Sequence, residues 1–336
     1  MSKVPAHDFR PSASLEVLQF RAQLLRRVRA FFDARGFWEV ETPLLSADTV
    51  VDVHLDPLRT TLFSDPRSPD TGRPLWLQTS PEFGMKRLLA SGAAAIYQVT
   101  KAFRGGEQGR LHNPEFTMVE WYRVGDGYDD GMRLVGELVV ELLGGPAPQR
   151  LSYGDAFRHY LNIDPHTAAI ERLAEAAGSA GGQAHFGSDR DAWLHLLLAE
   201  RIEPHLGVAR PTILYDYPAS QAALARVRSG TDAAEGAAGE PAVAERFELY
   251  IQGVEIANGY HELVDSTVLE DRNQRNNALR VADGRPSLPS ESRLLDAMRS
   301  GLPPCCGVAL GFDRLVMVAL GKPSLAEVLA FPIERA

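Results

Sequence analysis

Cysteine is nearly absent from this chain, and the little there is excludes two classes of protein. The only two cysteines, Cys305 and Cys306, are adjacent, so they can form neither a disulfide framework nor the spaced ligand pairs of a zinc site. Long hydrophobic runs are missing as well: no apolar stretch reaches the length of a membrane span, and the N-terminus lacks the apolar region of a signal peptide. We therefore expect a protein of the reducing cytoplasm that has no membrane partner.

Positive charge is in deficit. The chain has 35 lysines and arginines against 44 aspartates and glutamates, which gives a net charge of −9. This balance disfavours a protein whose main partner is a nucleic-acid backbone, although a local basic patch can exist within an acidic total. The 336 residues are 45% hydrophobic and 24% charged, which is typical of a soluble globular protein with one large domain or two ordinary ones.

Hairpins dominate the secondary structure that the sequence predicts. Residues 95–104 and 115–122 are expected to form two strands that flank a loop, and a second hairpin turns at Gln252-Gly253. Because strict alternation of strand and helix is absent, we predict an α+β fold whose mainly antiparallel sheet is flanked by helices. Residues 229–243 have neither a period nor large apolar side chains, and they predict a flexible surface loop.

Three predicted helices bear on function. Apolar spacing predicts a helix over residues 14–35, stopped by Gly36. A turn at Ser80-Pro81 leads into a second helix, and a glycine-rich strand passes through Gly311 into a third.

The first hairpin carries the most suggestive side chains. Alternation along its returning strand puts an aromatic ring, a thioether, a carboxylate and a phenol on one face: Phe116, Met118, Glu120 and Tyr122. Taken alone, this row is an aromatic cluster beside a solvated acid. Arg104 and His112 near the tip favour another interpretation, because cations there could hold phosphates beside a ring that stacks on a base.

Two carboxylates follow the second hairpin. Glu255 and Glu262 cannot share a face of one straight strand, but Gly259 would let the chain turn between them so that they converge on a cation. Oxygen ligands of this kind suit magnesium held together with substrate phosphates. The alternative is that both are surface acids, and the residues alone leave the two interpretations equal.

The third region is the glycine-rich strand and the helix after it. Asp313 and Arg314 at their junction place backbone N–H groups and a guanidinium where an anion could sit. The Walker pattern is absent, because Gly321-Lys322 is followed by Pro323, and neither a dinucleotide-binding glycine motif nor a nucleophile elbow is found.

Taken in order, these segments resemble the three signature motifs of class II aminoacyl-tRNA synthetases. WEVETP resembles motif 1, the stretch AFR…LHNPEFTMVEWY resembles motif 2 of lysyl-tRNA synthetases, and GVALGFDRLVM resembles motif 3. TSPEFGMKRLL and GVEIANGYHEL resemble the lysine-specific segments between them, and the resemblance extends from Pro11 to Ala336. The motif 1 proline, here Pro43, lies at the dimer interface in that family, so the resemblance implies a homodimer.

The resemblance is closest to one branch, truncated paralogues of lysyl-tRNA synthetase that attach (R)-β-lysine to a lysine of elongation factor P. RPSASLEVL, YPASQAALA and LAEVLAFPIERA carry it. We expect a single catalytic domain over residues 1–336 and no tRNA partner, because an anticodon-binding barrel has no room before motif 1. Ala309 stands where lysyl-tRNA synthetases usually carry glycine, and its methyl group could favour a β-amino acid over lysine.

The resemblance implies ATP as co-substrate and Mg²⁺ as cofactor. Arg104 would bind the α-phosphate, Phe116 would stack on adenine and Arg314 would hold the far phosphates. The implied ATP-binding residues are Arg104, Gly105, Gly106, His112, Asn113, Phe116, Glu255, Ile256, Gly311 and Arg314. The implied catalytic residues are Arg104, Arg314, Glu255 and Glu262, of which the two glutamates would ligate magnesium. The implied amino-acid pocket is lined by Ser80, Pro81, Glu82, Glu120, Tyr122, Glu262 and Ala309.

One departure from the family pattern bears on nucleotide choice. Members usually have Arg-Asn-Glu where this chain has Arg104-Gly105-Gly106, and the missing glutamate normally accepts a hydrogen bond from the adenine amino group. Either Glu107 substitutes for it or Phe116 holds the base alone. Losing one such bond is worth about 1 kcal/mol, so we expect weaker ATP binding but not its loss.

Two other functions compete with a protein-modifying ligase. One is an enzyme that forms the same lysyl-adenylate but transfers it to another acceptor, such as a tRNA or a small amine. The other is a non-catalytic regulator that only binds lysine or nucleotide, for which Gly105-Gly106 is the sole hint.

Overall fold

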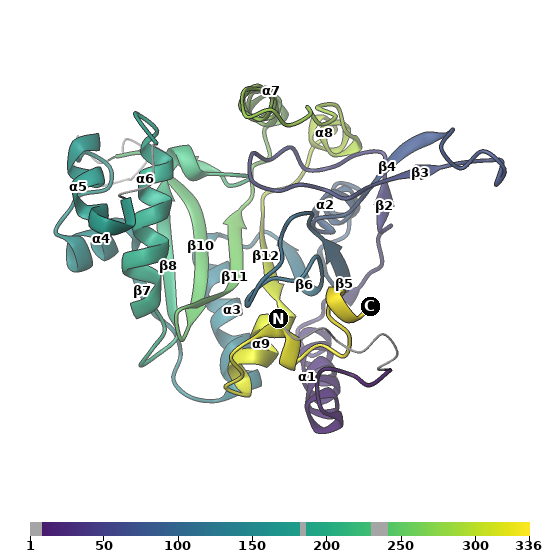
Figure 1. Cartoon of the computed structure of the whole chain (residues 1–336), viewed down its shortest axis with the longest axis horizontal. Helices are drawn as coiled ribbons and strands as arrows, with labels where there is room; N and C mark the ends of the chain where they lie inside the picture. The colour runs from purple at the N-terminus through teal and green to yellow at the C-terminus, as the bar shows by residue number, and fades with distance from the viewer. Residues whose placement is uncertain (1–8, 182–185, 230–240) are drawn as a thin grey trace. The chain divides into compact units, whose positions relative to one another are not determined.

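The computed structural model describes residues 9–181, 186–229 and 241–336 (Figure 1). The chain divides into two compact units. Unit 1 contains Met1–Gly125, Val264–Pro303 and Ala309–Ala336, and unit 2 contains Asp126–Leu263 and Pro304–Val308. The single catalytic domain expected from the sequence stays a prediction. Of the expected loop at 229–243, residues 230–240 lie outside the described residues.

The main strands of unit 1 confirm the first predicted hairpin. Strand β5 (Ala95–Phe103) pairs antiparallel with β6 (Glu115–Val124), and the short β1 (Trp38–Glu39) lies parallel to β5. Helix α1 (Leu15–Asp33) begins after Ser14, whose side chain accepts a hydrogen bond from the backbone of Val17. The predicted helix over 14–35 is therefore confirmed.

The packing of α1 against the hairpin comes from its apolar stripe, whose buried members are Leu24, Val28, Phe31 and Phe32. The ring of Phe32 stacks on Tyr97 of β5 at 4.7 Å and meets Trp121 of β6 at 5.1 Å. These contacts bury one face of β6 against α1, and they leave the alternate side chains Glu120 and Tyr122 on its other face.

A second, smaller sheet belongs to unit 1. It has the order β2 (Leu45–Ser46), β4 (Arg73–Leu77), β3 (Arg59–Leu62). Besides α1, the described helices of the unit are α2 (Glu82–Ala90), α7 (Ser266–Ala282), α8 (Arg293–Arg299) and α9 (Phe312–Ala319), with short 3₁₀ turns at Leu325–Glu327 and Ile333–Arg335. Helix α2 follows the turn at Ser80-Pro81, and β12 (Cys305–Gly311) passes directly into α9, as the sequence predicts.

Unit 2 contains its own set of paired strands. The order is β7 (Gln149–Ser152), β8 (Thr212–Pro218), β10 (Val243–Ile251), β11 (Val254–His261), and β9 (Val227–Arg228) also pairs with β10. The turn between β10 and β11 has positive φ at both Gln252 (53°) and Gly253 (72°), which is the two-residue hairpin that the sequence predicts.

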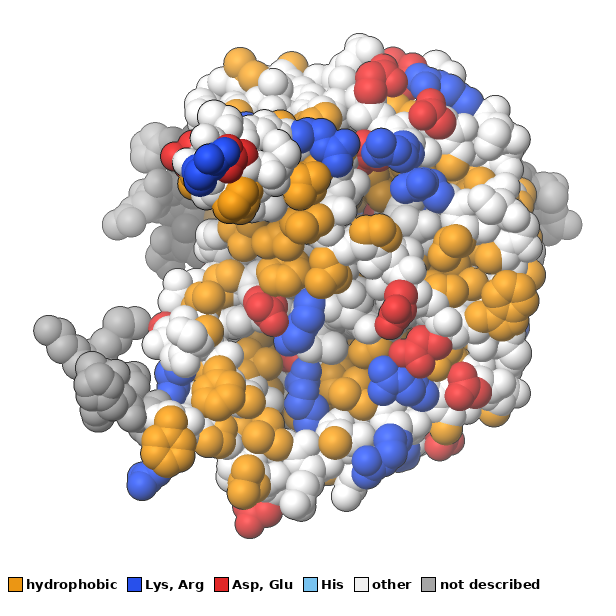
Figure 2. All heavy atoms as spheres, turned by 90° about the vertical axis from the view of Figure 1, so that its right-hand side faces the viewer, with side chains coloured by type: hydrophobic (Ala, Val, Ile, Leu, Met, Phe, Trp, Pro, Cys, Tyr) orange, Lys and Arg blue, Asp and Glu red, His pale blue; other side chains and the backbone are white. Residues whose placement is uncertain are grey.

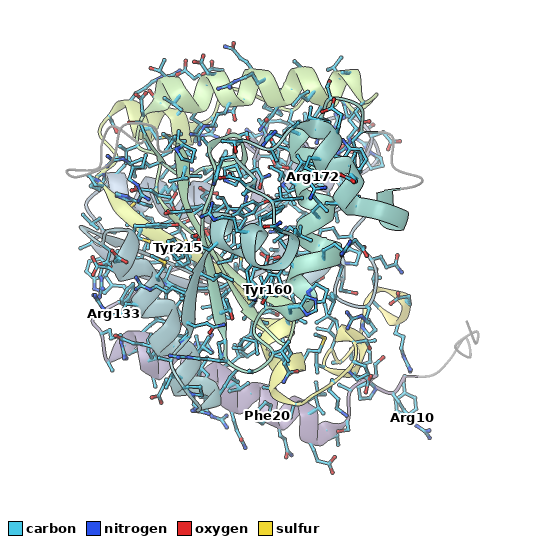
Figure 3. All side chains as sticks on the ribbon, turned by 90° about the vertical axis from the view of Figure 1, so that its left-hand side faces the viewer. Arg10, Phe20, Arg133, Tyr160, Arg172 and Tyr215 are labelled. Atoms are coloured by element: carbon cyan, nitrogen blue, oxygen red, sulfur yellow. The ribbon has the colours of Figure 1, made fainter. Side chains whose placement is uncertain are left out.

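Helices cover the strands of unit 2. They are α3 (Tyr128–Leu143), α4 (Tyr153–Leu161), α5 (Ile170–Gly181) and α6 (Arg190–Leu197), followed by the short turns Leu198–Ile202, Glu203–His205 and Ala219–Gln221. Figure 3 views this unit from the side of α4, which carries Tyr160, and α5, which carries Arg172. Tyr153, Phe157 and Leu194 from these helices form a core with Leu214 and Tyr217 of β8.

The predicted fold class is confirmed. The longest strand pairs in both units are antiparallel, only the pairs β1–β5 and β7–β8 among the described pairings are parallel, and helices pack on the strands. Within the described ranges, no helix combines the length and the apolar character needed to cross a membrane.

Candidate active site

A buried polar cluster lies where β6 meets the start of α2. Glu120 of β6 is 1% exposed, and it accepts hydrogen bonds from the hydroxyls of Ser80 (2.7 Å) and Tyr122 (2.6 Å). Ser80 also accepts a bond of 3.0 Å from the backbone N–H of Glu82, which fixes the turn into α2. One turn later, Lys86 Nζ lies 2.5 Å from Glu82 Oε1. We call Ser80, Glu82, Lys86, Glu120 and Tyr122 the Glu120 cluster.

Near neutral pH, Glu120 is present both as the charged carboxylate and as the neutral acid. Burial, reinforced by the nearby carboxylate of Glu82, raises the pKa of Glu120 from its ordinary value to about 7, while the hydrogen bonds from Tyr122 and Ser80 and the charge of Lys86 oppose the rise. A carboxylate in this state gains much by pairing with a cation, because the cation replaces the lost hydration. The solvated acid considered from the sequence is wrong, since Glu120 is shielded from water.

A second cluster forms around the loop between β5 and β6. The guanidinium of Arg104 lies over the ring of Phe116, 5.1 Å from its centre, and Arg104 Nη1 is 3.8 Å from Glu107 Oε1. His112 Nε2 accepts a hydrogen bond of 2.8 Å from Arg314, which also donates to the carbonyl of Leu111. We call Arg104, Glu107, His112, Phe116 and Arg314 the Arg104 cluster.

The state of His112 follows from this geometry. Burial, with the charges of Arg314 and Arg104, lowers the pKa of His112, and Glu107 opposes this. A neutral ring that accepts at Nε2 carries its proton on Nδ1. The cluster therefore presents two guanidinium groups beside an aromatic ring, which is the chemistry that binds a nucleoside phosphate.

The departure at Gly105-Gly106 has a local structural reason. The N–H of Gly105 donates to the carbonyl of Asp56 at 2.7 Å, and a Cβ on Gly105 would lie 3.2 Å from that oxygen and 3.3 Å from a methyl of Leu58. Gly106 has a φ of 77°, which favours glycine. Whether Glu107 or Phe116 alone holds the base stays open, although Glu107 lies close to both Arg104 and His112.

Asn113 of the predicted site and Asp313, the neighbour of Arg314, are tied into the fold. The side chain of Asn113 donates to the carbonyl of Glu115 (2.6 Å) and accepts from the N–H of Ile333 (3.0 Å). Asp313 accepts from the backbone of Thr117 at 2.8 Å and pairs with Arg21 at 2.5 Å, so it anchors α9 to β6 and α1. This anchor positions Arg314, the next residue of α9.

Ala309 and Gly311 of the motif 3 segment lie at the end of β12. Gly311 caps the N-terminus of α9, one turn before Arg314. Ala309 is partly exposed on β12, between the buried side chains of Val308 and Leu310. A methyl group at Ala309 is therefore accessible, whereas its neighbours belong to the core.

Glu255, Ile256 and Glu262 belong to unit 2, unlike the other predicted site residues. Strand β11 runs without a turn from Val254 to His261, so the predicted turn at Gly259 is wrong. Gly259 has a packing reason instead, because a Cβ there would lie 2.3 Å from the ring of Phe247. Glu262 follows the strand and is only 2% exposed, so it is no surface acid.

The two glutamates suit magnesium by their chemistry. Both offer hard carboxylate oxygens, and Glu262 is held by a backbone bond of 3.0 Å from its N–H to the carbonyl of Cys305. Among the described residues, no group of three or more His, Cys, Asp or Glu side chains is arranged to hold a metal ion. An ion held here therefore needs further oxygen ligands, which nucleotide phosphates can supply.

Sequence reasoning missed two participants. The pairing of Lys86 with Glu82 could have been predicted, because Lys86 lies four residues after Glu82 on a predicted helix and so shares its face. The contact of Asp56 with Gly105 could not have been predicted, because it joins two segments that no local sequence pattern connects.

Comparison with known proteins shows the family of the chain. The family model of class II tRNA synthetases (D, K and N) matches residues 3–335. The chain is 45% identical over 331 residues to a protein of Proteus mirabilis (strain HI4320) named elongation factor P–(R)-beta-lysine ligase, and the match covers 98% of each chain.

Proposed function

Since the chain belongs to the class II tRNA synthetase family of the D, K and N type, we propose that it is an ATP-dependent aminoacyl ligase acting on elongation factor P. It activates (R)-β-lysine as an aminoacyl-adenylate and transfers it to the side-chain amine of a lysine on that factor. The 45% identity to the Proteus mirabilis ligase supports this substrate and acceptor. The observation that carries the proposal is the buried Glu120, poised to pair with an amino group of the substrate.

In the first step, a carboxylate oxygen of the amino acid bonds to the α-phosphorus of ATP, and the bond to diphosphate breaks. Arg104 and Arg314 stabilise the negative charge on the phosphate oxygens, and Phe116 orients the base. Magnesium, when held by Glu255 and Glu262, would neutralise part of the phosphate charge.

In the second step, the acceptor amine attacks the carbonyl carbon of the adenylate, and AMP leaves. A lysine amine has a reference pKa of about 10.4, so it must lose a proton before it attacks. We assign this proton to a phosphate oxygen of the adenylate. Because the proposed acceptor is a translation factor, we propose that the reaction takes place in the cytoplasm.

Diphosphate exchange tests the active site. With ATP, magnesium and (R)-β-lysine, labelled diphosphate should enter ATP, because adenylate formation is reversible. Exchange that is absent with every lysine isomer would favour the non-catalytic regulator, and acylation of tRNA or of a small amine would favour another acceptor.

Ala309→Gly is expected to widen the use of α-lysine. Removing one methyl group from the site should reduce the ratio of kcat/KM for β-lysine over α-lysine by about fivefold or more. The measurement is diphosphate exchange with each amino acid. Ala244→Gly, at a buried position of β10, serves as the control for a general loss of packing. An unchanged ratio contradicts the role of Ala309.

We also propose that the chain is a homodimer that associates through unit 1. Figure 2 faces the side on which β3 and β4 lie, and hydrophobic side chains are spread over it. Apolar residues of this unit are exposed on and beside β1 and the small sheet: Trp38, Leu44, Leu45, Leu58, Leu62 and Phe63. Surface of this kind is typical of an interface. A second copy is the partner that motif 1 implies.

Light scattering should therefore give twice the chain mass of 36.8 kDa. Leu44→Glu with Leu45→Glu should give the monomer, because two charges would be buried in the interface. Val208→Glu, an exposed apolar position of unit 2, should remain dimeric. A monomeric unaltered protein would rule out this association.

A further inference from the structure

Lys86 is a buried cation of the TSPEFGMKRLL segment to which the proposed reaction gives no role. It is 1% exposed, and its ammonium group contacts the carboxylate of Glu82 at 2.5 Å, while Glu82 itself is 7% exposed. Burying a lysine is unfavourable unless a partner compensates its charge, so this pair needs a reason.

The reason follows from the number of charges in the Glu120 cluster. Without Lys86, the cluster would hold two buried carboxylates, Glu82 and Glu120, and the charge of Glu82 acts on Glu120. The hydroxyl of Ser80 donates to the Glu120 carboxylate and accepts from the backbone N–H of Glu82, which holds the two residues close together. Two carboxylates at one buried site resist ionising together, because each charge raises the free energy of the other. One of them would keep a proton at neutral pH, and a protonated carboxyl pairs poorly with an ammonium group.

We propose that Lys86, through its ion pair with Glu82, is a positioning residue that lets the buried Glu120 carry its charge and accept one ammonium group of the substrate. This inference rests on the proposed function, since it assigns how the substrate's amine is received. Lys86 does not touch the substrate in this account. It acts through Glu82.

The surroundings leave this role to Lys86. Tyr122 and Ser80 face Glu120 as hydroxyl donors, and the neutral Gln98 is its cross-strand neighbour on β5. Helix α8 packs on α2, but its charged side chains are exposed and paired elsewhere: Arg293 with Asp48, and Arg299 with Glu270 and with Asp296 of the same helix. Among the described contacts, Lys86 is therefore the cation that adjusts this cluster.

The test is the pH profile of kcat/KM for (R)-β-lysine, measured by diphosphate exchange at saturating ATP. This profile reports the pKa values of essential groups in the enzyme before it binds the amino acid. The unaltered enzyme should lose activity as the pH falls through about 7, where Glu120 gains its proton. Lys86→Met should move this acid limb upward by about one pH unit or more. Glu82→Gln should move it downward, because it removes a negative charge beside Glu120 and leaves the charge of Lys86, which favours the charged form of Glu120.

The double variant Lys86→Met with Glu82→Gln should return the limb close to its original position, and Lys86→Arg should leave it unchanged. A merely structural ion pair would reduce stability in these variants without moving the limb. If Lys86→Met does not fold, the proposal is still tested by whether the acid limb of Glu82→Gln moves to lower pH. A fixed limb in the folded variants overturns the proposal.

Failure of the proposed function gives a different result. If the unaltered enzyme shows no diphosphate exchange with any lysine, thermal unfolding at several pH values tests the role of Lys86 instead. The pH dependence of stability then reports the protonation of the Glu120 cluster. Lys86→Met should then lose more stability than the unaltered protein as the pH rises from 6 to 8. An equal loss in the two proteins overturns the role of Lys86.

Discussion

Replacing Glu120 by glutamine should raise the KM for (R)-β-lysine by about 100-fold or more and yet make the folded protein more stable. The loss of affinity follows because an amide cannot form an ion pair with the ammonium group in a buried site. The gain in stability follows because Glu120 is 1% exposed and its pKa is raised by burial to about 7. Ionising it at pH 8 opposes folding by up to about 3 kcal/mol, at about 1.4 kcal/mol for each pKa unit.

The sign of the pH dependence is fixed by this shift. Between the ordinary carboxyl pKa of 4.5 and about 7, the folded protein holds a proton that the unfolded chain has released. The associated stability is fully present below the lower value and is lost as the pH rises through the upper one. Glu120→Gln removes this dependence, so its excess stability should be large at pH 8 and small at pH 4.5.

Denaturant unfolding at both pH values, with KM from diphosphate exchange, checks the expectation. Glu115→Gln is the matched control, since Glu115 begins the same strand and its side chain is 48% exposed. It should change neither quantity appreciably. A Glu120→Gln protein that is less stable at pH 8, or that retains its KM, would show that Glu120 is a structural acid.

Arg280→Met should destabilise the protein by about 3–5 kcal/mol and raise the KM for ATP by about tenfold. Arg280 of α7 is 1% exposed and donates to the carbonyls of Asp52 (2.9 Å), Leu55 (3.3 Å) and Pro286 (3.1 Å). It also binds the carboxylate of Asp56 at 2.8 Å. These bonds are partly buried, and removing the guanidinium leaves all of their acceptors without this donor, which accounts for the lost stability.

The effect on ATP follows from the contact between Asp56 and Gly105. The carbonyl of Asp56 holds the N–H of the residue that follows Arg104, so a loosened 52–58 segment would loosen the Arg104 cluster. Arg275→Met is the control, because Arg275 is exposed on the same helix and has only a hydrogen bond to the carbonyl of Asp271 among the bonds described for it. An Arg280→Met protein with an unchanged KM for ATP would contradict this connection.

Local patterns in the sequence predict the framework of the site well. Alternation along residues 115–122 places Glu120 and Tyr122 on one face, and the structure joins them by a hydrogen bond of 2.6 Å. The hairpin at Gln252-Gly253 and the strand-to-helix step at Gly311 depend on turn and capping preferences, which short stretches of sequence encode.

The energetics of the site depend on tertiary contacts that no local pattern encodes. The burial of Glu120 results from packing against α2, a segment about 40 residues away, and its raised pKa follows from that burial. Arg280 reaches Asp56 across a separation of 224 residues. Gly259 was misjudged for a related reason: glycine in a strand allows either a turn or a close approach, and only Phe247 of the paired strand decides between them.

The measurement that tests the central claim most directly is the intact mass of elongation factor P after incubation with this protein, ATP, magnesium and (R)-β-lysine. Parallel reactions contain α-lysine, no amino acid, or tRNA in place of the factor. The account predicts a gain of one lysyl unit on the factor, larger with β-lysine than with α-lysine, and no acylated tRNA. An unmodified factor, in reactions where diphosphate exchange still proceeds, would contradict it and show that the adenylate is formed for another acceptor.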